Sequence, residues 1–205
     1  MLISLISTIL LGTLASSSQV SADPSRNVGQ DIARAALAQV GVTQHYDPMY
    51  VRLAYPGGDV PIDRGVCTDV IVRAFRAIGV DLQVEVYEDM RKNLSAYPNY
   101  WRSTRPDRNI DHRRVPNLMR YFERHGKKLS TDEKYEPGDI VAWRLASGNL
   151  HIGIVLEKRV PGKNYDYVVH NIGYGAKEED VLHAFNIIGH YRWSPRPGSD
   201  REKGG

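Results

Sequence analysis

Cys67 is the only cysteine in the chain, and its chemistry is the first clue to a site. A lone thiol is buried and inert, paired between chains, or reactive. Cys67 begins a predicted helix, where free backbone N–H groups and the helix dipole stabilise a thiolate and lower the thiol pKa. Its flank, residues 63–69, is polar and contains a glycine, which favours a nucleophile over a small core residue.

A cysteine nucleophile needs a base within hydrogen-bond reach and a third group that orients this base. Of the seven histidines, His151 opens a predicted strand after a turn, and His170 ends the next one. If these strands form a hairpin, both histidines lie at one edge of the sheet. We expect His151 to act as the base and His170 to orient it, with Asn171 as the alternative orienting residue.

Other polar side chains near these segments are candidate substrate contacts. Some of them also have a structural interpretation: Asp111 could cap the following helix, and Asp69 could favour the first helical turn through the dipole. The candidates for contact with substrate are Asp63, Arg64, Asp69, Asp111, His112 and Asn171.

The elements that must position these residues follow from the hydrophobic pattern. A period near 3.6 predicts helices over residues 27–40, 67–78, 81–97 and 116–126. Short apolar runs between turns predict strands over residues 140–143, 151–156, 165–170 and 187–193. Helices followed by strands indicate an α+β domain in which N-terminal helices pack on a small antiparallel β-sheet.

The ends of the chain suggest export. Residues 1–22 are apolar and then small, ending in Val-Ser-Ala, which predicts a signal peptide cleaved before Asp23. An uncleaved membrane anchor is the alternative, because no Lys or Arg lies between Met1 and the apolar run. One domain over residues 23–193 and a disordered polar tail over residues 194–205 complete the predicted organisation.

Composition narrows the class of function. Hydrophobic residues make up 41% of the chain and charged residues 25%, which is typical of a packed globular domain. The net charge of +3 is spread among acidic residues, and no nucleic-acid motif is present in the sequence. No H-E-x-x-H sequence supports a metal hydrolase. We expect a monomer with no metal and no cofactor, no nucleic-acid partner, and no stable membrane insertion after signal cleavage.

Three segments resemble the NlpC/P60 group of papain-like cysteine peptidases. Residues 67–82 are similar to the nucleophile helix of that group, which begins with Cys and ends in Gly. Pro137-Gly-Asp followed by the strand at 140–143, and then His151-Ile-Gly-Ile-Val, resemble its base strands. Val169-His170 resembles the strand that carries the third, polar residue.

A narrower resemblance points to the DUF1287 family within that superfamily. The segments that carry it are residues 63–69, 109–116 and 189–192. The stretch over residues 98–116, between the nucleophile helix and the sheet, is extra relative to the wider group.

The resemblance implies a papain-like NlpC/P60 fold and a Cys67–His151–His170 triad. It also implies a periplasmic or secreted hydrolase that cleaves an amide bond in peptidoglycan, as an endopeptidase or amidase. Which amide bond is cut stays open. A non-catalytic module that binds the cell wall or a partner through the same fold is the alternative.

Overall fold

The computed structural model describes residues 27–194, so the predicted signal peptide and the tail beyond Ser194 lie outside the described residues. Its helices are α1 (Val28–Leu37), α2 (Cys67–Ala77), α3 (Leu82–Asn93) and α4 (Val115–His125), with short 3-10 helices η1 (Leu94–Ala96) and η2 (Asp111–Arg113). Its strands are β1 (His45–Tyr46), β2 (Arg64–Gly65), β3 (Lys127–Leu129), β4 (Ile140–Arg144), β5 (Leu150–Arg159), β6 (Asp166–His170), β7 (Lys177–Glu179) and β8 (Asn186–Arg192).

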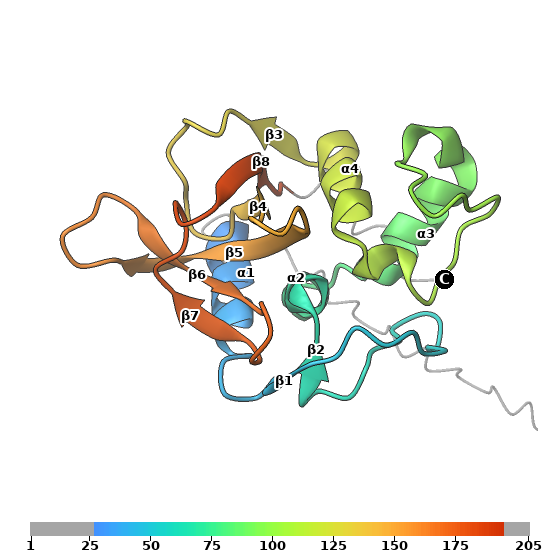
Figure 1. Ribbon diagram of the computed structural model, residues 1–205, viewed down its shortest axis with the longest axis horizontal. Helices are drawn as coiled ribbons and strands as arrows, with labels where there is room; N and C mark the ends of the chain where they lie inside the picture. The colour runs from blue at the N-terminus through green and yellow to red at the C-terminus, as the bar shows by residue number, and fades with distance from the viewer. Residues whose placement is uncertain (1–26, 195–205) are drawn as a thin grey trace, which may run out of the picture.

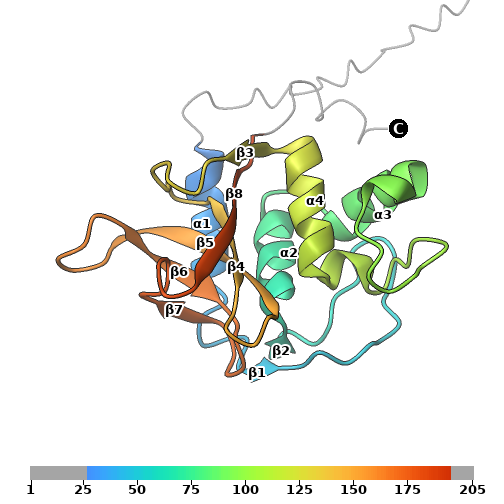
Figure 2. The same cartoon turned by 45° about the horizontal axis from the view of Figure 1, so that its top comes forward.

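The main sheet has six strands in the order β3-β8-β4-β5-β6-β7, and every neighbouring pair is antiparallel. The two-residue strands β1 and β2 form a separate parallel pair. Helices α2 and α4 stand between the sheet and α3 in both views (Figures 1 and 2). The predicted α+β class, with helices packed on an antiparallel sheet, is confirmed.

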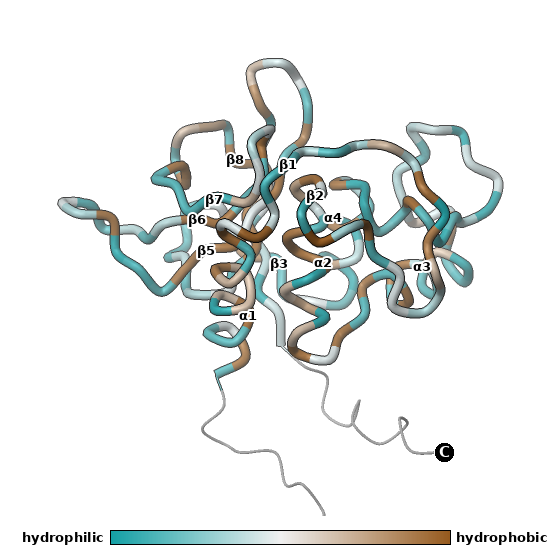
Figure 3. Tube along the Cα trace, turned by 90° about the horizontal axis from the view of Figure 1, so that it is seen from below, coloured by the Kyte–Doolittle hydropathy of each residue, from teal (hydrophilic) through white to brown (hydrophobic). Residues whose placement is uncertain are grey.

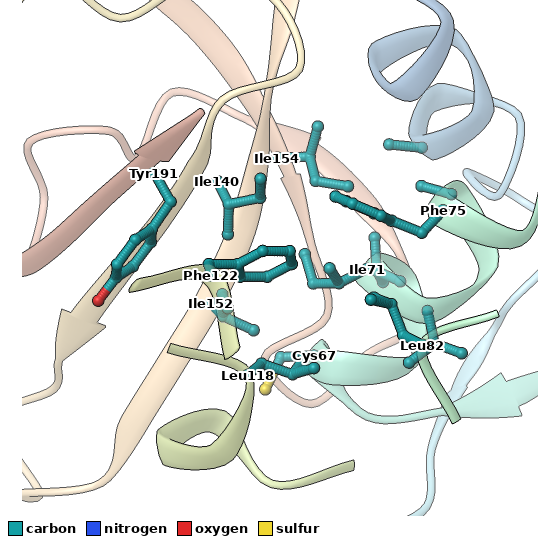
Figure 4. Close-up of a cluster of buried hydrophobic side chains, with 14 of the residues drawn as sticks. Cys67, Ile71, Phe75, Leu82, Leu118, Phe122, Ile140, Ile152, Ile154 and Tyr191 are labelled. Atoms are coloured by element: carbon teal, nitrogen blue, oxygen red, sulfur yellow. The ribbon is translucent and has the colours of Figure 1, made fainter. Parts of the chain in front are cut away.

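The main core lies between the helices and one face of the sheet. Figure 4 shows its central side chains, among them Phe75 of α2, Phe122 of α4 and Ile154 of β5, with Cys67 in the same cluster. A smaller cluster around Trp143 and Val155 covers the opposite face of the sheet. Hydropathy along the chain agrees, because hydrophobic stretches run through α1, α2 and β5 (Figure 3). The site is therefore built on rigid, packed elements.

Local chemistry explains where the helices begin. The side chains of Asn27 and Asp81 accept backbone N–H bonds at the starts of α1 and α3. Pro116 occupies the first turn of α4, where no N–H is needed. The predicted helix over 81–97 instead ends at Asn93 and continues as η1.

Two strands of the main sheet were not predicted. Both β3 and β7 are three residues long and lie at the sheet's edges, and their sequences are Lys-Lys-Leu and Lys-Glu-Glu. Charged residues on short edge strands protect a sheet from pairing with other chains, but they erase the alternating pattern that predicts a strand. The pairing of β7 with β6 proves important for the site.

The Pro137-Gly138-Asp139 turn is held by a buried charge cluster. Asp139 accepts bonds from the ring of His190 at 2.7 Å and from Arg192 at 2.8 Å, and also from the backbone N–H of Glu136. A Cβ at Gly138 would lie 2.2 Å from the carbonyl oxygen of Gly29, so only glycine lets the turn pack on α1. The cluster joins the Pro137-Gly138-Asp139 turn, which leads into β4, to His190 and Arg192 of β8.

Within residues 27–194, no helix combines the length and apolar character that crossing a membrane requires.

Replacing Asp139 with Ala should lower the free energy of unfolding by about 3–5 kcal/mol, because it leaves buried His190 and half-buried Arg192 without their acceptor. Urea unfolding measures this, with exposed Asp132→Ala as the control. Burial opposes ionisation, yet the bonds from Arg192 and His190 hold the pKa of Asp139 below its usual range. The contribution is thus present above about pH 4 and is lost as pH falls below it. A difference between wild type and Asp139→Asn that grows in acid would contradict this.

Candidate active site

Cys67 is the first residue of α2, and the turn before it is fixed by Asp69. The Asp69 carboxylate accepts the backbone N–H of Val66 at 2.7 Å. A Cβ at Gly65 would lie 2.9 Å from the same carboxylate, so the close approach requires glycine. The backbone N–H groups of Cys67 and Thr68 lie beside the sulfur, where they favour its thiolate form. The start of α2 is therefore a polar cradle around one thiol.

A second interaction locks this cradle to the surrounding loops. Arg113 of η2 donates to both oxygens of Asp69 at 2.9 and 3.0 Å, and the two side chains are almost fully buried. The same guanidinium donates to the backbone oxygens of Asp47 and Met49. The hydroxyl of Thr68 donates back to the carbonyl of Arg113. The loop at Asp47 and Met49, the start of α2, and η2 are distant in the sequence, and these bonds join them next to Cys67.

His151 and His170 are in direct contact. Nε2 of His151 lies 2.8 Å from Nδ1 of His170, and both rings are buried. Trp143, the partner of His151 across β4 and β5, stacks on the His151 ring with centroids 5.5 Å apart. A Cβ at Gly153 would lie 3.1 Å from the Trp143 ring, which explains the glycine after His151-Ile152. The residue in contact with the His151 ring is therefore His170, whereas the side chain of Asn171 binds the carbonyl of Gly65.

Glu179 extends the pair of histidines on the outer strand β7. Its carboxylate lies 2.9 Å from Nε2 of His170. The negative charge of this carboxylate favours a proton on Nε2 of a neutral His170, and Nδ1 of His170 then accepts from Nε2 of His151. This assignment leaves Nδ1 of His151 unprotonated, as a base requires.

The thiol and the base line one cavity of about 820 Å³. The backbone N–H of Ile152, which follows His151, lies against the sulfur of Cys67, so the start of α2 meets β5 at this point. Residues from the 98–116 segment, including Trp101 and Arg114, form another wall, and the β4–β5 turn contributes Gly148 and Asn149. The cleft is thus bounded by the helical layer and one end of the sheet.

Burial controls the charge state of this site. Burial and the nearby Asp69 carboxylate raise the pKa of Cys67 to about 12, against the effect of the backbone N–H groups. Burial and His170 lower the pKa of His151 to about 3. Burial also lowers the pKa of His170, although Glu179 acts in the opposite direction. Both groups are therefore neutral at rest, and the lowered thiol pKa expected from the helix start alone is wrong.

Six further residues were predicted to contact substrate, and none of them is among the described residues that line the cavity. Asp63 is exposed and pairs with Arg64 at 3.2 Å, and Arg64 also lies 3.5 Å from Asp47. His112 is buried within η2, and burial lowers its pKa to about 4. Their positions do not support contact with a substrate in this cleft.

The side chains of the other three candidates bind neighbouring groups of the protein. Asp69 holds Arg113 and the turn before Cys67, as described above. Asp111 accepts the backbone N–H of Asp107 and the guanidinium of Arg114, and burial raises its pKa. Asn171 donates to the carbonyl of Gly65 at 2.9 Å. Asp69 and Asp111 therefore fix arginines that line the cavity, and Asn171 fixes the backbone two residues before Cys67.

Sequence patterns gave no signal for several residues of the site. Glu179 lies in a charged tripeptide, and only the β6–β7 register brings it near His170. Trp143 was expected in a strand, but its stacking on His151 depends on the β4–β5 register. Among residues 27–194, no group of three or more His, Cys, Asp or Glu side chains is arranged to hold a metal ion.

These features define an α+β protein whose single thiol lines one cleft with His151, and whose His170 contacts His151. Residues 33–193 match the family described as "Domain of unknown function (DUF1287)", and the chain belongs to that family. It is also 52% identical over 170 residues to a protein of Escherichia coli (strain K12), described as "Uncharacterized protein YijF", with 82% of each chain covered. The predicted family is confirmed.

Two solved structures are similar, both from Trichomonas vaginalis. One is described as NlpC1, with 16% identity and a TM-score of 0.46, covering 85% of this chain and 46% of its own. The other is described as NlpC2, with 14% identity and a TM-score of 0.43, covering 83% of this chain and 49% of its own. The present chain thus spans about half the length of either structure.

The raised thiol pKa predicts slow alkylation of the folded protein. At each pH between 6 and 9, iodoacetamide should modify folded Cys67 more slowly than the same chain unfolded in urea, whose thiol titrates near pH 8.5. The thiolate fraction limits the reaction, and the single cysteine makes mass spectrometry unambiguous. Faster labelling of the folded chain at pH 7 would indicate a preformed thiolate–imidazolium pair instead.

Proposed function

We propose that this protein is an exported cysteine hydrolase that cleaves an amide bond in peptidoglycan, as an endopeptidase or amidase. The observation that carries the proposal is that Cys67 and His151 line the same cavity, while His170 contacts the ring of His151. The predicted signal peptide and the resemblance of three segments to NlpC/P60 peptidases support the compartment and the substrate class. We expect a monomer that acts in the periplasm or outside the cell.

The first chemical step is attack assisted by a general base, because the resting thiol is protonated. Nδ1 of His151 takes the proton of Cys67 as the sulfur forms a bond to the substrate carbonyl carbon. The backbone N–H groups of Cys67 and Thr68 hold the developing oxyanion, and one such donor is typically worth about 3–4 kcal/mol. His170 keeps Nδ1 of His151 free to accept.

The second half of the reaction releases both products. The C–N bond breaks as His151 returns the proton to the leaving amine, and a thioester to Cys67 remains. His151 then takes a proton from a water molecule, which attacks the thioester carbonyl and frees the acid and the thiol. No metal or cofactor is needed for either half.

The buried state of Cys67 favours one other function. A thiol that is 5% exposed and has a raised pKa also suits a non-catalytic module that binds the cell wall or a protein partner through the same cleft. The two functions differ in whether Cys67 is needed for turnover, which the next experiment decides.

Digestion of purified sacculi tests the proposal. Wild type should release peptide fragments, and Cys67→Ala should reduce their rate of release by about 10³-fold or more, because it removes the nucleophile. Mass spectrometry of the products identifies the bond that is cut, and circular dichroism checks that the variant is folded. Equal binding to sacculi by both proteins, with no Cys67-dependent fragment from several peptidoglycan types, would favour the binding module.

Glu179 should act as a positioning residue for the histidines. In Glu179→Gln an amide N–H can donate to Nε2 of His170, which reverses the proton order and places a proton on Nδ1 of His151. We expect kcat to fall by about 10- to 100-fold, within the ~10²–10⁴-fold that general acid–base catalysis contributes. NMR of ¹⁵N-labelled histidine should report the change of tautomer.

Two variants serve as controls for Glu179. Glu178→Gln alters the adjacent residue, whose carboxylate pairs with Lys158 instead, and should keep wild-type kinetics and tautomers. Glu179→Asp should retain the native tautomers and restore part of kcat. If Glu179→Gln and Glu178→Gln behave alike in both measurements, the proposed order of protons is wrong.

A further inference from the structure

Arginines supply the charged side chains among the described residues that line the cleft. Among the described residues that line the cavity, three are arginines, Arg113, Arg114 and Arg144, and none is Asp or Glu. Cationic side chains placed in a concave site usually face an anionic group of the ligand. The three guanidiniums differ in how many hydrogen bonds and ion pairs they already make within the protein.

Arg113 is already paired. Its guanidinium is buried, with bonds to both oxygens of Asp69 and to two backbone carbonyls. Its charge and its donors are used within the protein, so it serves as part of the cleft's frame.

Arg114 is held in place through one nitrogen of its guanidinium, and its other N–H donors remain for a ligand. One nitrogen donates to Asp111 at 2.8 Å, and the guanidinium carbon lies 3.9 Å from the centre of the Trp101 ring. Asp111 is 2% exposed and also accepts a backbone N–H, so it fixes Arg114 firmly. A guanidinium that is stacked and anchored at one edge presents its remaining donors in one direction.

Arg144 is the charge that the protein leaves unused. It ends β4, opposite Leu150, so it lies one residue pair from the Trp143–His151 pair. The side chain is exposed, and one of its guanidinium nitrogens lies 3.5 Å from the carbonyl oxygen of Gly148. Within the part of the chain that the structure describes, no carboxylate forms an ion pair with it.

We infer that the cleft recognises a carboxylate of its substrate through Arg144, with Arg114 on the facing wall as the second donor. This inference rests on the proposed function and narrows its substrate class to acidic stem peptides, which carry free carboxyl groups along the peptide. Guanidinium and carboxylate match in geometry and form paired charge-assisted hydrogen bonds. Peptides in which these carboxylates are amidated should be poor ligands.

Binding to an inactive protein tests the inference without requiring turnover. Cys67→Ala is titrated in a calorimeter with the tetrapeptide L-Ala-γ-D-Glu-diaminopimelate-D-Ala, and with the same peptide amidated at its free carboxyl groups. The acidic peptide should bind at least about tenfold more tightly, since each hydrogen bond to a charged group contributes on the order of a tenfold change or more. Equal affinities, or no binding of the acidic peptide, would overturn the inference.

The arginine is tested by Arg144→Gln in the same Cys67→Ala background. The variant should weaken binding of the acidic peptide about tenfold and leave the amidated peptide unchanged, which removes the preference. The matched control is Arg91→Gln, which removes one exposed arginine of α3 that pairs with Glu88. An Arg144→Gln protein that keeps the wild-type preference would refute the role of Arg144. If Arg144→Gln fails to fold, the comparison of the two peptides on Cys67→Ala still decides the inference.

Kinetics with active enzyme separate this inference from the proposed function. If wild type cuts sacculi and Arg144→Gln raises KM for the acidic peptide with little change in kcat, both stand. If wild type cuts sacculi but acidic and amidated peptides bind alike, the hydrolase stands and the carboxylate subsite fails. If no substrate is cut but the acidic peptide binds selectively, the subsite stands and the hydrolase fails.

Discussion

The buried ion pair between Asp69 and Arg113 holds together the segments that meet at Cys67. Asp69 fixes the turn before the thiol, and Arg113 binds the loop around Asp47 and Met49. An ion pair of this kind tolerates burial only because its remaining donors and acceptors are also satisfied. Here those additional bonds connect the loop after β1, the start of α2, and η2. The position of Cys67 and of one wall of the cleft therefore depend on a single interaction.

Burial also sets the chemistry of the site. The packing that places Cys67 and His151 beside the core removes them from water, which favours the neutral form of each. The helix start favours the thiolate, but its N–H groups do not offset the loss of hydration and the nearby Asp69 carboxylate. The chain from Glu179 through His170 to His151 supplies orientation in place of a preformed charge. The charge in the cleft comes instead from arginines on its walls.

Much of the fold could be predicted because it follows from local pattern. The four long helices and four inner strands carry clear periods, and the helix start at Cys67 was placed at the correct residue. The short edge strands β3 and β7 escaped because charged residues hide their period. The six polar residues expected to face substrate do not line the described cavity, for a related reason. A polar residue in a motif marks importance, but whether it faces a cavity or a buried arginine depends on packing across the chain.

The sequence by itself determined the α+β class, the family, the cysteine at a helix start and the two histidines on successive strands. These are properties of residue type and spacing over short stretches, which the hydrophobic period and turn chemistry encode directly. Tertiary structure decided that His170 rather than Asn171 touches His151, that Glu179 lies next to His170, and that Arg144 lines the cleft. Strand register and burial set these relations, and both arise only when distant segments pack against one another.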